Sequence, residues 1–182
     1  METTKNKMPV YAQNFFDKLS NYLNTKIYYF GSIQRHDYFP KSSDIDVDIF
    51  TDNESQTINY LMNFLGLKKY EFKKFVYKLH KTDKLVYGHK VKYKEPNNNF
   101  AVEISIYNEN VKNEVLEEHN SKTDIPMYAS LLLIILKYIY YNLNLIPKSY
   151  YKYLKGLIMN YLIEGQDVEF VTTEIPKHKD RD

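Results

Sequence analysis

Residues 43–50 read SDIDVDIF, and this alternation of acidic and aliphatic side chains constrains the fold more than any other stretch. Alternate residues of an extended chain share one face, so the stretch predicts a half-buried β-strand and does not fit an amphipathic helix. The core-facing set is Ile45, Val47 and Ile49, and the opposite set is Asp44, Asp46 and Asp48. Three like charges on one face repel each other, so the strand needs a neutralising partner.

A second alternating strand, residues 100–107 (FAVEISIY), supplies another acid. Val102, Ile104 and Ile106 face the core there, which turns Glu103 and Ser105 outward. If the two strands are neighbours, Glu103 lies beside Asp44 and Asp46. Hard carboxylate oxygens suit Mg²⁺ or Mn²⁺, and a two-ion site is expected on this open face, in contact with substrate phosphates. The alternative is an exposed sheet edge with solvated acids.

The remaining pattern predicts an α/β (α+β) fold, a mixed β-sheet with helices on one face plus a C-terminal helical bundle. Residues 70–80 fit either a helix or a strand. Helices are expected at 10–23, 53–65, 127–141 and 149–163, and strands at 26–30, 43–50, 85–93 and 100–107. The predicted organisation is a single compact unit, 1–182, with an α/β part at 9–120, a helical part closing a cleft at 121–170 and a polar tail at 171–182.

Composition excludes several classes of protein. The chain has no cysteine, so it has no thiolate metal site, thiol nucleophile or disulfide; this fits a reducing compartment, and a cytoplasmic protein is expected. The apolar stretch MYASLLLIILKYIYYNL is shorter than the ~20 residues that span a bilayer and contains Lys137. We therefore expect a buried core helix and no membrane partner.

Charge is unevenly distributed along the chain. Between Lys68 and Lys94 there are ten lysines against Glu71 and Asp83. Such a run is either a solvated face or a basic wall for a polyphosphate or nucleic-acid substrate. Gly31-Ser32 precedes the acidic strand, and it is a separate candidate for phosphate contact, because glycine lets backbone approach a phosphate and the serine hydroxyl donates to it.

The combination FGS…SDIDVDIF resembles the signature of the DNA polymerase β-type nucleotidyltransferase superfamily. The spacer, IQRHDYFPKS, is similar to that of minimal and antitoxin-type members. The resemblance implies a polymerase β-like fold in which Asp44 and Asp46 hold two metal ions and Glu103 holds the catalytic one. It also implies that Gly31 and Ser32 hold the β- and γ-phosphates of a nucleoside triphosphate. Asp48 has no fixed role in the pattern and is interpreted as an outer-shell or solvated acid.

The C-terminal half is similar to the helical core of poly(A) and poly(U) polymerases and oligoadenylate-synthase-like enzymes. This resemblance implies that Lys137 contacts the triphosphate, that Ser149 contacts phosphate and that Tyr150 stacks on the base. The alternative is that Lys137 only extends toward water and Tyr150 packs in the core.

Together these features predict a magnesium-dependent enzyme that transfers a nucleoside monophosphate to an acceptor hydroxyl and releases pyrophosphate. An RNA 3′ end is the first choice of acceptor, because of the lysine-rich region and the helical resemblance. Two alternatives stay open: a protein or small-molecule hydroxyl as acceptor, and a non-catalytic nucleotide-binding protein.

Overall fold

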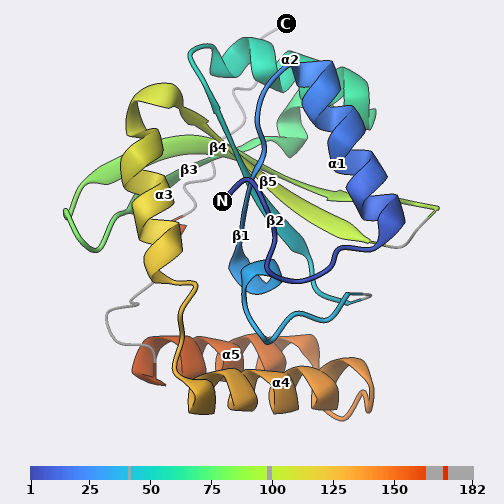
Figure 1. The fold of residues 1–182 in the computed structure, drawn as a ribbon, viewed down its shortest axis with the longest axis vertical. Helices are drawn as coiled ribbons and strands as arrows, with labels where there is room; N and C mark the ends of the chain where they lie inside the picture. Colours follow the sequence, from blue (N-terminus) through green and yellow to red (C-terminus); the bar gives the residue numbers. More distant parts are fainter. Residues whose placement is uncertain (41, 98–99, 163–169, 172–182) are drawn as a thin grey trace, which may run out of the picture.

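The computed structural model describes residues 1–40, 42–97, 100–162 and 170–171. A mixed sheet of strand order β1-β2-β5-β4-β3-β6 forms the centre (Figure 1). The strands are β1 (Tyr28–Phe30), β2 (Ile45–Thr51), β3 (Lys73–Lys78), β4 (Leu85–Lys94), β5 (Ala101–Asn108) and β6 (Phe170–Val171). Strands β2 and β5 run parallel to each other, and the other neighbouring pairs are antiparallel.

Two helices cover one face of this sheet, α1 (Val10–Leu23) and α2 (Glu54–Leu65). Their apolar stripes pack on the aliphatic residues of β2 and β5, which are fully buried as the alternation predicts. Helix α2 is capped at its start by Asn53, whose side chain accepts a hydrogen bond from the backbone N–H of Gln56. Gly66, in the left-handed conformation, caps its end. The prediction of helices at 10–23 and 53–65 is confirmed within a residue or two.

The opposite face carries helix α3 (Lys112–Ser121), which the sequence pattern did not predict. Its segment KNEVLEEHNS is mostly polar, and Val115 is its one buried apolar side chain, packed among Tyr28, Phe50 and Tyr107. Helix α3 covers only part of the face. Along β2 the acids therefore change from exposed at Asp44 to half-buried at Asp46 and fully buried at Asp48.

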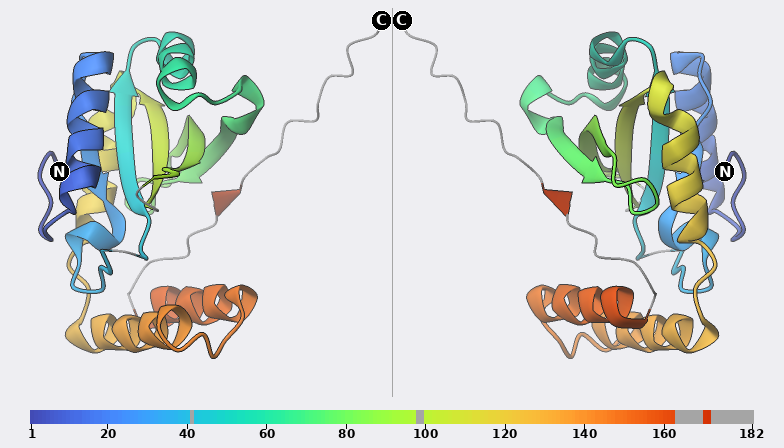
Figure 2. Two further views of the ribbon diagram at one scale, coloured as in Figure 1. Left: turned by 90° about the vertical axis from the view of Figure 1, so that its right-hand side faces the viewer. Right: turned by 90° about the vertical axis from the view of Figure 1, so that its left-hand side faces the viewer.

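Helices α4 (Met127–Tyr141) and α5 (Lys148–Leu162) form an antiparallel pair beyond one end of the sheet (Figure 2). They pack on each other through stacked Tyr140 and Tyr151, whose ring centroids lie 4.3 Å apart. The prediction that α4 is a buried core helix is wrong, because only one side of it is covered: Leu131 is 56% exposed. Among the described residues, no helix has the length and apolarity needed to cross a membrane.

The predicted α+β class is confirmed, although helix α3 adds cover on the second face of the sheet. The ambiguous stretch at 70–80 is mainly a strand, β3, because alternating Phe75 and Tyr77 bury against β4 and α3. The polar tail was predicted at 171–182, but Val171 ends strand β6. The rest of that tail, 172–182, and the end of the predicted last helix at 163 lie outside the described residues.

Candidate active site

The register of two parallel strands brings the carboxylates together. Asp46 of β2 is the direct neighbour of Glu103 of β5, and on its other side it pairs with Phe30 of β1. Asp44, two residues earlier, lies just before β2 on the same side and is exposed. The expectation that the two acidic strands are neighbours is thereby met, and all three acids reach one cavity.

Gly31 follows β1 directly and begins the short 3-10 turn Gly31–Gln34. Its φ is +71°, in the left-handed region that other residues adopt only with strain. A Cβ atom built on it would lie 2.2 Å from the Oδ2 of Asp46. The backbone of the Gly-Ser turn therefore lies against the Asp46 carboxylate, and only glycine leaves room for this approach.

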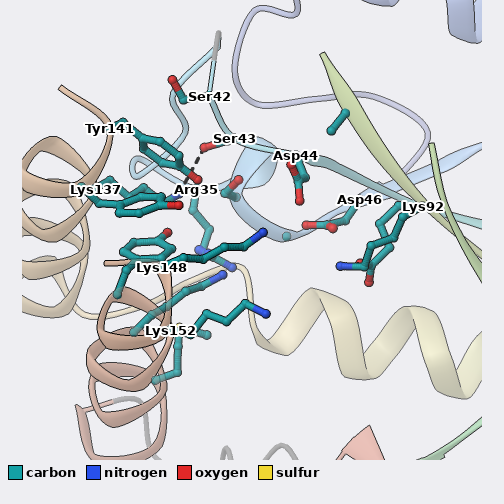
Figure 3. A pocket seen from close by; sticks show the side chains of 18 residues that line it. Arg35, Ser42, Ser43, Asp44, Asp46, Lys92, Lys137, Tyr141, Lys148 and Lys152 are labelled. Carbon is teal, nitrogen blue, oxygen red and sulfur yellow. Dashed lines mark hydrogen bonds and ion pairs between the residues drawn. The ribbon is translucent and has the colours of Figure 1, made fainter. Parts of the chain in front are cut away.

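The cavity beside these residues has a volume of about 590 Å³ and is bounded by the sheet end on one side and the α4–α5 pair on the other (Figure 3). Six of the eight site residues predicted from the sequence line this cavity. These six are Gly31, Ser32, Asp44, Asp46, Glu103 and Lys137. Ser149 and Tyr150 are not among the described residues that line it, and Tyr150 is 52% exposed. Their neighbour Tyr151, only 8% exposed, lines the cavity instead.

Asp46 is the most perturbed acid of the cavity. Burial raises the pKa of Asp46 to about 6, and the nearby negative charges of Glu103 and Asp44 contribute to the rise. A buried carboxylate with like charges beside it gains stabilisation when a cation binds. The pair Asp44 and Asp46 therefore offers hard oxygen donors with an excess of negative charge, which fits a divalent ion.

Glu103 has cationic partners within the chain. Its Oε1 lies 2.6 Å from the Nζ of Lys90, and its Oε2 forms an ion pair with Lys92, both from the neighbouring strand β4. Burial alone would raise the pKa of Glu103, but the two ammonium groups outweigh it and lower the pKa below its ordinary value. Within the described part of the chain, no three His, Asp or Glu side chains are arranged to hold a metal ion. A metal ion that used Glu103 would have to replace these lysines.

A basic wall faces the acids across the cavity. This wall is not the Lys68–Lys94 run. It consists of three lysines at helical spacing on α5, namely Lys148, Lys152 and Lys155. Figure 3 shows Lys148 and Lys152 extending from the helix toward the side where Asp44 and Asp46 lie. Residues 125–163 contain no Asp or Glu, and all four of their lysines line the cavity. This absence of acids was the signal in the sequence that could have identified the basic wall.

Lys137 lines the cavity but is held by a buried ion-pair network. Its Nζ lies 2.8 Å from the Oδ2 of Asp37 and donates to the Ser43 hydroxyl at 3.3 Å. Arg35 pairs with the other oxygen of Asp37 at 2.8 Å. Burial would raise the pKa of Asp37, but Arg35 and Lys137 outweigh it and lower the pKa to about 2. The network joins α4 to the loop that leads into β2, a role for Asp37 that sequence reasoning missed.

Asp48 corrects one expectation. It is fully buried beneath α3, with its Oδ2 2.8 Å from the Nδ1 of His119, whereas a solvated or outer-shell acid was predicted. The His119 ring stacks on Phe30 at 4.1 Å between centroids. Asp48 shares a face with Asp46, but helix α3 covers that part of the face, so it lies apart from the cavity.

Comparison with known sequences finds a family match. Residues 12–121 match the family model described as "Nucleotidyltransferase domain". The chain belongs to this nucleotidyltransferase family, as the match covers more than half of it. No curated protein sequence matches the chain.

Three solved structures are similar to it at low identity. Terminal uridylyl transferase 4 from Trypanosoma brucei with bound UTP and UMP shares 14% identity over 73% of this chain and 53% of that chain, with a TM-score of 0.32. Cid1, described by its RNA terminal uridylyl transferase activity, shares 18% identity over 70% of this chain and 36% of that chain, with a TM-score of 0.33. The non-canonical poly(A) polymerase complex GLD-2–GLD-3 shares 14% identity over 74% of this chain and 46% of that chain, with a TM-score of 0.37. The chain thus spans from about a third to about half of these proteins.

Proposed function

We propose that this chain transfers a nucleoside monophosphate from a nucleoside triphosphate to the 3′ hydroxyl of an RNA, with Mg²⁺ or Mn²⁺ as cofactor. One observation carries the proposal: a cavity of about 590 Å³ has paired carboxylates beside a Gly-Ser turn on one side and three lysines on the other. A metal-bound triphosphate has the complementary charges, cations for the acids and anionic oxygens for the lysines.

Asp44, Asp46 and Glu103 would hold two metal ions. When bound, such ions neutralise the phosphates and activate the attacking hydroxyl. Asp44 and Asp46 fit this role as they stand, because their charges lie close together with too little compensation. Glu103 would bind metal only after its ion pairs with Lys90 and Lys92 break, and the two lysines could then bind phosphates.

The chain's other groups bind and orient the nucleotide. The Gly31-Ser32 turn places backbone N–H groups and a hydroxyl beside the acids, where the β- and γ-phosphates would lie. Lys148, Lys152 and Lys155 would neutralise the triphosphate and the departing pyrophosphate. The aromatic part of the cavity consists of Tyr140, Tyr141 and Tyr151, and the stacked pair Tyr140 and Tyr151 would contact the base.

The choice of RNA as acceptor rests on strand β4. Lys90, Lys92 and Lys94 alternate along it and so share the face that carries Glu103, with Lys73 of β3 opposite Lys90. This row of cations runs from the acids outward across the sheet. A polyanionic strand whose 3′ end lies at Asp46 would find its phosphates matched there.

A non-catalytic nucleotide-binding role is the second candidate, and the ion pairs of Glu103 are the observation that favours it. Incubation of the protein with each labelled nucleoside triphosphate, RNA oligonucleotides and Mg²⁺ or Mn²⁺ separates the candidates. Extended RNA supports the proposal, label on protein points to a protein acceptor, and bound but unchanged nucleotide supports the second candidate.

Matched variants make this assay specific. Asp46→Asn should abolish extension, whereas Asp52→Asn, at an exposed acid just after β2, should leave it unchanged. If Asp46→Asn retains full extension, the assignment of the metal site is wrong.

A further inference from the structure

The outward side of helix α4 carries an apolar stripe that the described residues of the chain leave largely uncovered. Its members lie at helical spacing along nearly the whole helix: Met127, Tyr128, Leu131, Leu132, Ile135 and Tyr138. Each is between 42% and 88% exposed. We propose that this α4 stripe pairs with the α4 stripe of a second copy of the chain and forms a two-fold symmetric dimer.

The size of the α4 stripe is the first argument. Six large apolar residues that are each at least 42% exposed leave an area on the order of several hundred Å², comparable with the ~800 Å² that each partner buries in a standard protein interface. The largest apolar patch on a typical monomer is only ~300–600 Å². Two further exposed leucines, Leu143 and Leu145, follow shortly after the helix.

The absence of charge on the α4 stripe argues for a second copy as the partner. A two-fold interface brings each patch against itself, so any charge in it would meet its own like charge. Residues 125–163 contain no acid, and the one lysine of α4, Lys137, is buried on the opposite side of the helix in its ion pair with Asp37. The stripe can therefore meet itself without repulsion.

The position of the stripe is compatible with an open cavity. The inward side of α4, with Ala129, Leu133 and Lys137, faces the loop before β2 and helix α5. The stripe lies on the other side of α4, although the Tyr128 hydroxyl at its start reaches the Leu162 carbonyl of α5 at 3.3 Å. In Figures 1 and 2, α4 lies along the edge of the molecule away from the sheet. Two antiparallel α4 helices, each about 22 Å long, would pair there and leave both cavities accessible.

The test measures mass in solution. Sedimentation velocity of the full chain at 1–100 µM should show a dimer of about twice the 21.8 kDa chain mass. Leu131→Glu should raise the dimer dissociation constant at least tenfold, while Leu85→Glu, at a leucine that is 51% exposed on β4, should not change it. Circular dichroism melts check that both variants fold.

A cross-linking experiment tests the same contact by geometry. The chain has no cysteine, so Leu132→Cys introduces a single thiol near the centre of the stripe, where an antiparallel two-fold axis would bring it close to its own copy. Mild oxidation should give a covalent dimer for Leu132→Cys and not for Leu85→Cys. A monomeric mass for the unmodified chain at 100 µM, or equal cross-linking of both variants, would overturn the proposal.

Discussion

The Cβ that Gly31 lacks would lie 2.2 Å from the Oδ2 of Asp46, and the φ of Gly31 is +71°. The turn for which we propose phosphate binding and the carboxylate for which we propose metal binding thus occupy adjoining space. They lie next to each other because β1 and β2 are paired at Phe30 and Asp46. Glycine at position 31 is therefore a condition for the site as well as for the turn.

Gly31→Ala should destroy the site more than the fold. The left-handed backbone costs an alanine about 1–2 kcal/mol, and the new methyl group displaces the Asp46 carboxylate. We expect RNA extension to fall at least 100-fold. The matched control is Gly66→Ala, because Gly66 has a similar φ of +67° but nothing within 4 Å of a built Cβ. Equal activity losses in the two variants, measured beside urea unfolding curves, would contradict the proposed role of Gly31.

The arrangement of Gly31, Asp46 and Glu103 was predictable because it depends on strand alternation and strand neighbourhood. Side chains on alternate residues share a face whatever surrounds them, and two buried strands that share a sheet align their acids. The ion pairs of Glu103 with lysines from β4 depend on the register between β4 and β5, which no local pattern specifies. The burial of Asp48 depends on α3, whose polar sequence gave no signal for a helix.

Asp46→Asn should stabilise the metal-free protein at neutral pH. The pKa of Asp46 is raised from 3.8 to about 6, so its charge destabilises the fold at every pH where it is ionised in the native state. The penalty is absent below pH 3.8, grows between pH 3.8 and 6, and is complete above pH 6. We expect the variant to gain about 1–3 kcal/mol in the free energy of unfolding at pH 7.5 and nothing at pH 3.5.

Unfolding with and without a divalent metal ion tests the same carboxylate as a ligand. Mg²⁺ or Mn²⁺ should raise the unfolding midpoint of the unmodified chain at pH 7.5, and this shift should shrink as the pH falls through 6, because protonated Asp46 is a poor ligand. Asp46→Asn should lose the metal-dependent shift, and Asp52→Asn should keep it. A metal shift that survives in Asp46→Asn would place the ion elsewhere.

Tyr151→Leu should weaken nucleotide binding more than Tyr150→Leu. Tyr151 lines the cavity and stacks on Tyr140, whereas Tyr150 is 52% exposed and outside the cavity. Loss of one aromatic stacking partner costs about 1–3 kcal/mol, so we expect a roughly 5- to 150-fold rise in the dissociation constant for a nucleoside triphosphate. Fluorescence titration with a labelled nucleotide measures both variants. A larger effect at Tyr150 would favour the role implied by the sequence resemblance.

These two tyrosines also show why the helical part was harder to predict than the strands. Neighbouring residues on a helix point about 100° apart, so an offset of one position moves a side chain from the cavity to solvent. The tyrosine-rich stretch offers candidates at 150, 151 and 153, and only the packing of α5 on α4 selects among them. On a strand, an offset of one position moves a side chain to the opposite face of the sheet, and the alternating aliphatic residues show in the sequence which face is which.

Asp37→Asn should destabilise the whole chain, because it leaves Arg35 and Lys137 buried without their shared counter-charge. Removing one partner of a buried ion pair typically costs about 3–5 kcal/mol. The pKa of Asp37 is lowered to about 2, so the stabilising charge is fully present above pH 4 and is lost as the pH falls through 2. The difference in unfolding free energy between the variant and the unmodified chain should therefore shrink between pH 4 and pH 2. Urea unfolding across this range measures it, with Glu2→Gln, at an exposed pair with Lys26, as the control that should change little. A difference that does not vary with pH would mean that Asp37 acts by packing and not by charge.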